Sequence, residues 1–192
     1  MKIFYFDTET SGVNANENGI IQLAYLLEVD GAIEAEGELF SNCAGKEINE
    51  KALEVNRYTR DTVADFPPPS DMYRKLHALF NKHVNAYDRT DKMIAGGYNV
   101  DFDLRFLRRL WFDNGDKFFG SFFAFGTLDP GPLFRYLQWR GLIPFEDAKM
   151  TLTDIATYFA IDTTNAHDAL VDIKMTRNIL LKINTLLRQA SL

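Results

Sequence analysis

Two carboxylates stand one residue apart near the start of the chain, at Asp7 and Glu9. They follow the apolar and aromatic run 3–6, which is typical of a buried strand. Residues two apart in a strand point to the same face, so both carboxylates would project to one side. Two anions that close either share a proton or hold a cation, and Mg²⁺ prefers carboxylate oxygens. The ordinary alternative is a solvated strand end.

A second group of polar residues lies at 98–103, where an expected strand gives way to an expected helix. Asn99 suits the cap of that helix. Asp103 lies about one turn into the helix, beside apolar neighbours, and a carboxylate there needs a partner. Asp101 competes for the same role, although its place in the first turn is also explained by the helix dipole.

A third group combines His167 with Asp172, five residues apart. On one continuous helix these two side chains would diverge by about 140°. They converge only if His167 lies in the loop before the helix and Asp172 lies in its first turns. Asp168 suits the first turn as well, and a loop histidine without a function is the ordinary alternative.

The apolar periodicity predicts the elements that would carry these groups. Strands are expected over 2–8, 20–29, 32–40 and 92–98, with Asp30-Gly31 as a hairpin turn. Helices are expected from about Ile48 with Asn49 as cap, after Ser70 as cap, from Asn99 to Trp111, over 153–159 and over 168–187. Ile48, Ala52 and Val55 form the apolar spacing of the first helix. Glutamates alternate along 32–40, which is typical of an edge strand. A hairpin that leads a mixed sheet covered by helices is an α/β layered fold.

Two further patterns could serve either the core or a ligand. The Phe-rich stretch 117–132 favours a buried strand that ends near Asp129, with Pro130-Gly131-Pro132 as its stop. The alternative is that some of its rings, within 118–125, stack on nucleic-acid bases. In the helix after Asn99, three arginines lie largely off the apolar stripe: Arg105, Arg108 and Arg109.

Length and composition favour a single domain, 1–192. Cys43 is the one cysteine, so no disulfide forms within the chain, which fits a reducing cytoplasm. No leader-like segment and no membrane-spanning run are present, so neither secretion nor membrane insertion is expected. The net charge of −6 argues against a protein that coats long duplexes, but it is compatible with handling a nucleic-acid end through bound cations.

Together these residues resemble the DEDD superfamily of 3′→5′ exonucleases, in its histidine branch. Members include the proofreading epsilon subunit of bacterial DNA polymerase III, ribonuclease T and oligoribonuclease. The resemblance rests on three motifs in order, Phe6–Gly12, Asn99–Asp103 and His167–Asp172, and on the connecting segments 20–31, 48–56 and 152–161. Tyr98 stands where many relatives have His, and Gln22 stands where many have Glu.

The resemblance implies a ribonuclease H-like fold, a five-stranded mixed β-sheet flanked by α-helices. It selects Asp103 over Asp101 and Asp172 over Asp168. It further implies that two divalent cations, Mg²⁺ with Mn²⁺ able to substitute, lie about 4 Å apart. Their implied ligands are Asp7, Glu9, Asp103 and Asp172; the implied general base is His167; and the residues implied to line the terminal nucleotide are Thr8, Thr10 and Asn99.

The implied activity is a 3′→5′ exonuclease that releases nucleoside 5′-monophosphates from nucleic-acid 3′ ends, with single-stranded DNA or DNA proofreading and repair as the expected setting. A polymerase subunit acting in trans is an expected partner. Three alternatives stay open: an exoribonuclease, an endonuclease of the same fold, and a catalytically silent binding module. An endonuclease would not require His167, and silent modules typically lose an acid that this chain retains.

Overall fold

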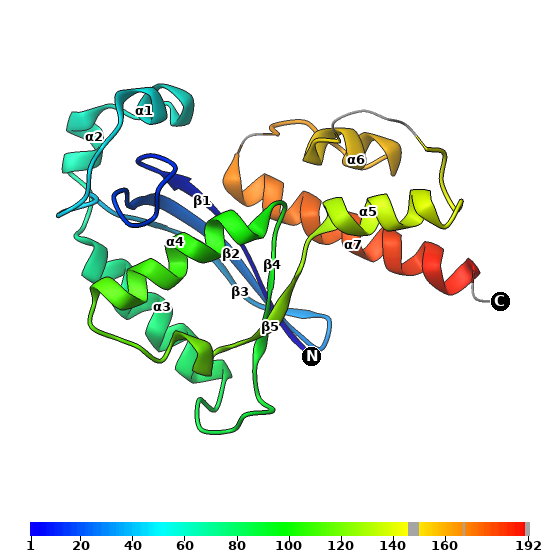
Figure 1. Ribbon diagram of the computed structural model, residues 1–192, viewed down its shortest axis with the longest axis horizontal. Helices are drawn as coiled ribbons and strands as arrows, with labels where there is room; N and C mark the ends of the chain where they lie inside the picture. The colour runs from blue at the N-terminus through cyan, green and yellow to red at the C-terminus, as the bar shows by residue number, and fades with distance from the viewer. Residues whose placement is uncertain (146–149, 167, 191–192) are drawn as a thin grey trace.

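Five strands form one mixed sheet in the computed structural model, which describes residues 1–145, 150–166 and 168–190 (Figure 1). The strands are β1 (Lys2–Thr10), β2 (Ile20–Val29), β3 (Ala32–Phe40), β4 (Met93–Gly96) and β5 (Phe123–Leu128). Their order is β3-β2-β1-β4-β5, with β1 antiparallel to β2 and parallel to β4. The predicted fold class, a five-stranded mixed sheet flanked by helices, is confirmed.

The hairpin between β2 and β3 turns at Asp30 and Gly31, both with positive φ (51° and 90°), as the sequence predicts. β3 is an edge strand, and its glutamates are exposed. The edge therefore carries the charge that discourages pairing with another sheet.

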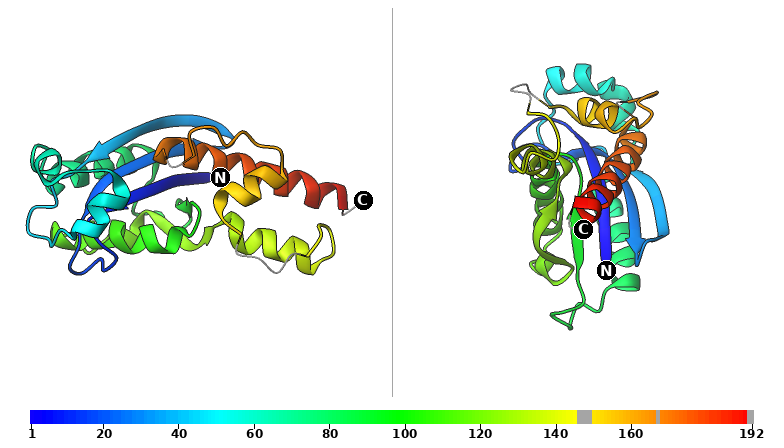
Figure 2. Two further views of the ribbon diagram at one scale, coloured as in Figure 1. Left: turned by 90° about the horizontal axis from the view of Figure 1, so that it is seen from above. Right: turned by 90° about the vertical axis from the view of Figure 1, so that its right-hand side faces the viewer.

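Seven α-helices are described: α1 (Glu50–Asn56), α2 (Arg60–Ala64), α3 (Pro69–His83), α4 (Val100–Asp113), α5 (Pro130–Trp139), α6 (Leu152–Tyr158) and α7 (Ala169–Ala190). The two further views place α4 on one side of β1 and α7 on the other (Figure 2). Phe4 and Phe6 of β1 belong to the core that α3 and α4 cover, whereas Ile3 and Tyr5 pack with the start of α7. Both faces of the central strand are therefore buried. Within the described ranges, no helix is long and apolar enough to cross a membrane.

Several local predictions are wrong in detail. The cap of α3 is Pro68 with Pro69 in the first turn, so Ser70 lies inside the helix. In α1, whose cap is Asn49 as predicted, the buried residue is Leu53, whereas Val55 is 73% exposed. The short helix α2 was not predicted, and neither was α5. Residues 130–132 end the strand but also begin α5, because a proline in the first helical turn needs no hydrogen-bond partner for its nitrogen.

The Phe-rich stretch divides between core and surface. Its strand begins only at Phe123, after a 3₁₀ turn over Phe119–Ser121. Phe119, Phe122 and Phe123 are buried beneath α3 and α4, which confirms core packing for these rings, but Phe118 and Phe125 are exposed.

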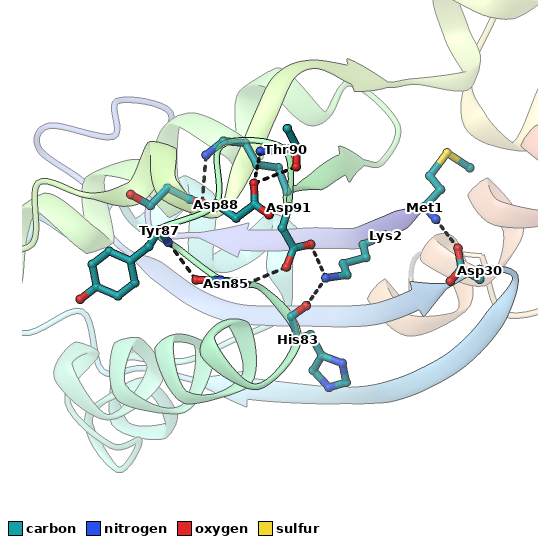
Figure 3. Close-up of polar contacts among 11 residues, drawn as sticks. Met1, Lys2, Asp30, His83, Asn85, Tyr87, Asp88, Thr90 and Asp91 are labelled. Carbon is teal, nitrogen blue, oxygen red and sulfur yellow. Dashed lines mark hydrogen bonds and ion pairs between the residues drawn. The ribbon is translucent and has the colours of Figure 1, made fainter.

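Polar contacts fasten the first residues of β1 to the connection between α3 and β4 (Figure 3). The Lys2 ammonium donates to the His83 carbonyl and forms an ion pair with Asp91. Asp91 also accepts a hydrogen bond from the Asn85 backbone, at 2.8 Å. These contacts lie at the end of β1 far from its carboxylates and hold the start of the strand beside β4.

Candidate active site

Asp7 and Glu9 lie near the C-terminal end of β1. Because side chains alternate along a strand, they continue the face of Ile3 and Tyr5, which is the face that α7 covers. Thr8 lies between them and points to the opposite face, toward α4. The end of β1 therefore presents carboxylates to one helix and a hydroxyl to the other.

Asp103 is buried in the first turns of α4, with 4% of its surface exposed. Its Oδ1 accepts two hydrogen bonds from Thr8, one from the backbone nitrogen at 3.0 Å and one from the hydroxyl at 2.5 Å. The close approach of α4 to β1 depends on Gly97, where an added Cβ would lie 2.8 Å from the Phe6 carbonyl oxygen. These contacts bring a residue 96 positions away in sequence beside Asp7.

The first turn of α7 distinguishes its two candidate acids. The Asp168 carboxylate accepts hydrogen bonds from the backbone nitrogens of Leu170 and Val171, both at 3.1 Å, so it caps the helix. Asp172 lies one turn further on, is half-buried, and acts electrostatically on Asp7. On α4, Asp101 is exposed while Asp103 is buried. Asp103 and Asp172 are thus the two candidates whose charges act on Asp7, and their role as metal ligands stays a prediction. His167 lies outside the described residues.

Burial and charge crowding dominate the electrostatics of this acid cluster, by which we mean Asp7, Glu9, Asp103 and Asp172. Burial raises the pKa of Asp7 well above its ordinary value, and the charges of Asp103, Glu9 and Asp172 raise it further. Burial also raises the pKa of Asp103 to about 7, although the hydrogen bonds from Thr8 act in the opposite direction. Among the described residues, no three His, Cys, Asp or Glu side chains are already arranged to ligate a metal ion.

A hydrogen-bonded chain borders Glu9 on the β2 side. Glu9 is paired across the sheet with Gln22. The Gln22 amide accepts from the Tyr58 hydroxyl at 2.7 Å and donates to Glu38 at 2.6 Å. A glutamate in place of Gln22 would bring a further carboxylate between Glu9 and Glu38, whereas the neutral amide satisfies both of its neighbours.

The residues expected to line a terminal nucleotide have different surroundings. Thr8 and Thr10 are buried, and their hydroxyls are already engaged, that of Thr10 with the Gly12 carbonyl at 2.6 Å. Asn99 is exposed at the cap position of α4 in a left-handed conformation (φ 53°), but its side chain makes no capping hydrogen bond. The predicted cap position is therefore right and the predicted side-chain bond is absent. Contact with a nucleotide stays a prediction for all three residues.

A cavity of about 280 Å³ opens beside the end of β1, between Thr10 and α1. Its lining is mostly apolar and includes Val13, Ala52 and Val55. The sequence placed Ala52 and Val55 only in the apolar spacing of this helix, so their position at a cavity was missed. One signal was available in the sequence. A helix as short as α1 needs few apolar residues to pack on the core, and Leu53 already does so, which leaves Ala52 and Val55 for another surface.

A family model described as Exonuclease (RNase_T) matches residues 4–180. The chain belongs to this exonuclease family. The match covers all four members of the acid cluster and the elements that carry them.

Known relatives of this exonuclease domain are much longer than the chain. It is 27% identical over 178 residues to the DNA polymerase III PolC-type of Staphylococcus haemolyticus, a match that covers 93% of the chain and 11% of the relative. Exonuclease I from Methylocaldum szegediense has a similar structure, with a TM-score of 0.75 at 20% identity over 98% of this chain and 40% of that one. The zinc-bound E. coli Exonuclease I–ssDNA complex gives 0.73 at 17% identity, over 98% and 41%. The chain thus spans about a tenth of the curated relative and two fifths of these structures, whose likeness establishes the shared fold.

Proposed function

We propose that this exonuclease domain is a metal-dependent enzyme that shortens single-stranded DNA from its 3′ end and releases nucleoside 5′-monophosphates. The observation that carries the proposal is the meeting of four carboxylates from β1, α4 and α7, with the pKa of Asp7 raised by burial and further by the charges of the three others. A fold has no structural use for such crowding, since it costs stability unless a cation offsets it. Membership of the exonuclease family and the likeness to an enzyme crystallised with single-stranded DNA support the same conclusion.

The donor set fits divalent cations that prefer oxygen. All four ligands are carboxylates, the set that suits Mg²⁺ and Mn²⁺. Two of them have pKa values raised by burial and by mutual repulsion, so a cation would relieve an unfavourable arrangement. Metal binding would draw the four side chains together. When bound, the two cations would lower the pKa of the attacking water and stabilise the leaving 3′ oxygen.

The side chains have distinct parts in this proposal. Asp7 is the central ligand, because the charges of the other three acids all act on its carboxylate. Thr8 orients Asp103 and favours its ionised form by donating hydrogen bonds from both its hydroxyl and its backbone N–H. His167 is the predicted general base that accepts the proton of the attacking water. The apolar cavity beside Thr10 would receive the terminal base, with Val55 and Val13 against its face.

A comparison of label positions tests the proposal. Single-stranded DNA labelled at the 3′ or the 5′ end is digested with Mg²⁺, with Mn²⁺ and with a chelator. The expected result is immediate release of labelled mononucleotide from the 3′ label and a descending ladder from the 5′ label, both abolished by the chelator. Internal fragments would indicate an endonuclease, and tight binding without cleavage would indicate a silent module. Faster digestion of RNA than of DNA would overturn the choice of substrate.

Asp7→Asn is expected to abolish this digestion without unfolding the protein, because it removes a metal ligand and a source of repulsion together. Asp65→Asn, at an exposed acid that ends α2, is the matched control and is expected to retain activity. Wild-type digestion by Asp7→Asn in Mg²⁺ would refute the proposed site.

Association with a polymerase stays a prediction for this chain. It is supported by the name of the curated relative, in which the matching segment is a small part of a PolC-type polymerase.

A further inference from the structure

The outer side of α4 borders two hollows that meet along the helix. The first, of about 760 Å³, lies between α4 and the loop 13–16. The second, of about 490 Å³, lies between α4 and β5. Both are lined by Asp101, Leu104 and Arg108, so the two hollows adjoin along the helix, and we call them together the α4 groove. In Figure 1, α4 lies in front of the sheet.

The α4 groove lies at the same end of β1 as the acid cluster, although none of its lining residues belongs to that cluster. The loop 13–16 follows directly on the end of β1, four residues after Glu9. On the helix side, Asp101 is two residues from Asp103 and lines both hollows. From Asp101 the groove follows α4 away from the acids as far as Phe112, roughly three turns. A strand whose 3′ end lies at the acid cluster would therefore find this groove next along its length.

Two uncompensated arginines line the α4 groove on a chain whose net charge is −6. Within the described part of the chain, neither Arg105 nor Arg108 forms an ion pair; Arg105 donates through Nε to the Asp101 carbonyl. Arg109 differs, because it is paired with Asp113 at 2.7 Å and donates to Asn16, which fastens α4 to the loop. The Asp101 carboxylate opposes part of the positive charge. The remaining charge suits a polyanion.

Exposed aromatic rings line both hollows. Phe112, 58% exposed, borders the first, and Phe125, fully exposed, borders the second. The guanidinium of Arg109 lies over the Phe112 ring at 5.0 Å. Both rings are exposed, whereas Phe119, Phe122 and Phe123 are buried in the core, so Phe112 and Phe125 are not needed for core packing. Arginines interleaved with exposed rings are the combination that binds single-stranded nucleic acid without reading its sequence.

We propose that the α4 groove binds the part of a single-stranded DNA that lies 5′ of the reacting end, with Arg105 and Arg108 on phosphates and Phe112 and Phe125 stacked on bases. The proposal rests on the proposed exonuclease function for the choice of strand and for the position of its end. It assigns a role to surface residues that neither the core nor the acid cluster explains.

Binding without hydrolysis tests the groove directly. The protein is held in chelator, and its affinity for 5′-fluorescent oligothymidylate of about 20 nucleotides is measured by anisotropy over a range of salt concentrations. Arg105→Ala/Arg108→Ala is expected to weaken binding at least tenfold and to reduce the slope of log K against log salt by about 1.4, the value for two lost phosphate contacts. An oligonucleotide of about 4 nucleotides is too short to follow the groove. Its affinity is therefore expected to fall much less in the same double variant.

Lys182→Ala/Arg188→Ala is the matched control, because it removes the same charge from the exposed far end of α7. A reduction of slope in this variant equal to that of the arginine pair would show a general charge effect and overturn the proposal. Phe125→Ala is expected to weaken binding at least fivefold with no change in the salt slope, since stacking involves no counterion release. Unchanged affinity in both the arginine pair and Phe125→Ala would also overturn the proposal.

The outcomes for groove and enzyme are separable. A wild-type protein that binds through Arg105 and Arg108 but releases no mononucleotide with Mg²⁺ refutes the proposed function and leaves the groove standing. A protein that digests DNA but whose arginine variant keeps full affinity refutes the groove alone. Oligouridylate bound at least tenfold more tightly than oligothymidylate would overturn the assignment to DNA.

Discussion

Asp7 and Thr8 are neighbours in the chain, yet they serve opposite faces of the sheet. Asp7 points toward α7, whereas Thr8 donates two hydrogen bonds to Asp103 on α4. One strand end therefore supplies both a charge and the means of orienting a second charge. Hydrogen bonds to an ionised carboxylate favour that form, so Thr8 opposes the rise in pKa that burial imposes on Asp103.

Thr8→Val tests this role. Losing the hydroxyl is expected to raise the pKa of Asp103 above about 7, because one of the groups that lower it is removed. The acidic limb of the rate against pH should then move to higher pH by about one unit, since metal ligands must be deprotonated. Thr8→Ser, which keeps the hydroxyl, is expected to behave like the wild type. Identical pH profiles for Thr8→Val and Thr8→Ser would show that the hydroxyl does not tune Asp103.

The raised pKa of Asp103 also predicts how stability depends on pH in chelator. In the folded state the pKa is about 7, against an ordinary value of 3.8, so the folded protein holds this proton more tightly than the unfolded chain. Its stabilising contribution is complete below pH 4 and is lost as pH rises through 7. The urea midpoint should therefore be lower at pH 8 than at pH 5. Carboxylates with a lowered pKa, such as Asp91, titrate below this window.

Asp103→Asn is expected to weaken this pH dependence, to which the raised pKa of Asp7 also contributes, and added Mg²⁺ is expected to raise the midpoint at pH 8. An apo protein whose midpoint rises between pH 5 and pH 8 would contradict the assignment of the raised pKa.

At the scale of elements, the site depends on how closely α4 approaches β1. Gly97 lies between β4 and α4, and its lack of a side chain allows Val100 and the Phe6 carbonyl to come together. Gly96 does the same for the Tyr5 ring, 2.6 Å from where a Cβ would lie. The paired glycines thus set the depth at which the first turn of α4, and Asp103 with it, meets the end of β1.

Gly97→Ala is expected to destabilise the protein by about 1–3 kcal/mol, because the new methyl group meets rigid backbone. It should also lower kcat by displacing Asp103 from Asp7. Gly120→Ala is the control, since nothing lies within 4 Å of its added Cβ. Urea unfolding and initial rates check both effects, and equal behaviour of the two variants would show that the close approach is not required.

At the scale of the whole molecule, the described core consists of separate apolar clusters. One joins the sheet to α3 and α4 and contains Trp111, and another joins α5, α6 and α7 around Ile179. A third cluster, at the start of α7, connects that helix to β1 and β2. Because α7 takes part in both of the last two clusters, we propose that residues 1–192 fold as one domain.

A single cooperative transition is the expected result of that arrangement. Trp139→Phe leaves Trp111 as the one tryptophan, a reporter of the sheet core. Ile179→Ala in this background should destabilise by about 2–5 kcal/mol and move the fluorescence and circular dichroism midpoints together. A Trp111 transition that does not respond to Ile179→Ala would show that the α5–α7 cluster is a separate unit.

Local signals in the sequence were sufficient for most elements. Apolar and aromatic runs mark β1 and β2, alternation marks β3, and Asp30-Gly31 supplies the positive φ angles of the hairpin. Helical spacing marks α3, α4, α6 and α7. The two unpredicted helices, α2 and α5, are five and ten residues long, and α5 begins at a proline that also reads as a stop. Short helices are decided by packing rather than by propensity, so their local signal is weak.

The sequence by itself was enough to predict which acids form the site, because the resemblance carried by three motifs in order selects Asp103 over Asp101 and Asp172 over Asp168. Tertiary structure alone decided what surrounds them. It placed the Thr8 hydroxyl on Asp103 and turned Val55 toward a cavity. It also set Arg105 and Arg108, which form no ion pair with any described residue, beside exposed rings. The physical reason is range: residue type and spacing govern chemistry and local conformation, whereas burial and charge crowding depend on segments that meet only when the sheet and its helices are packed.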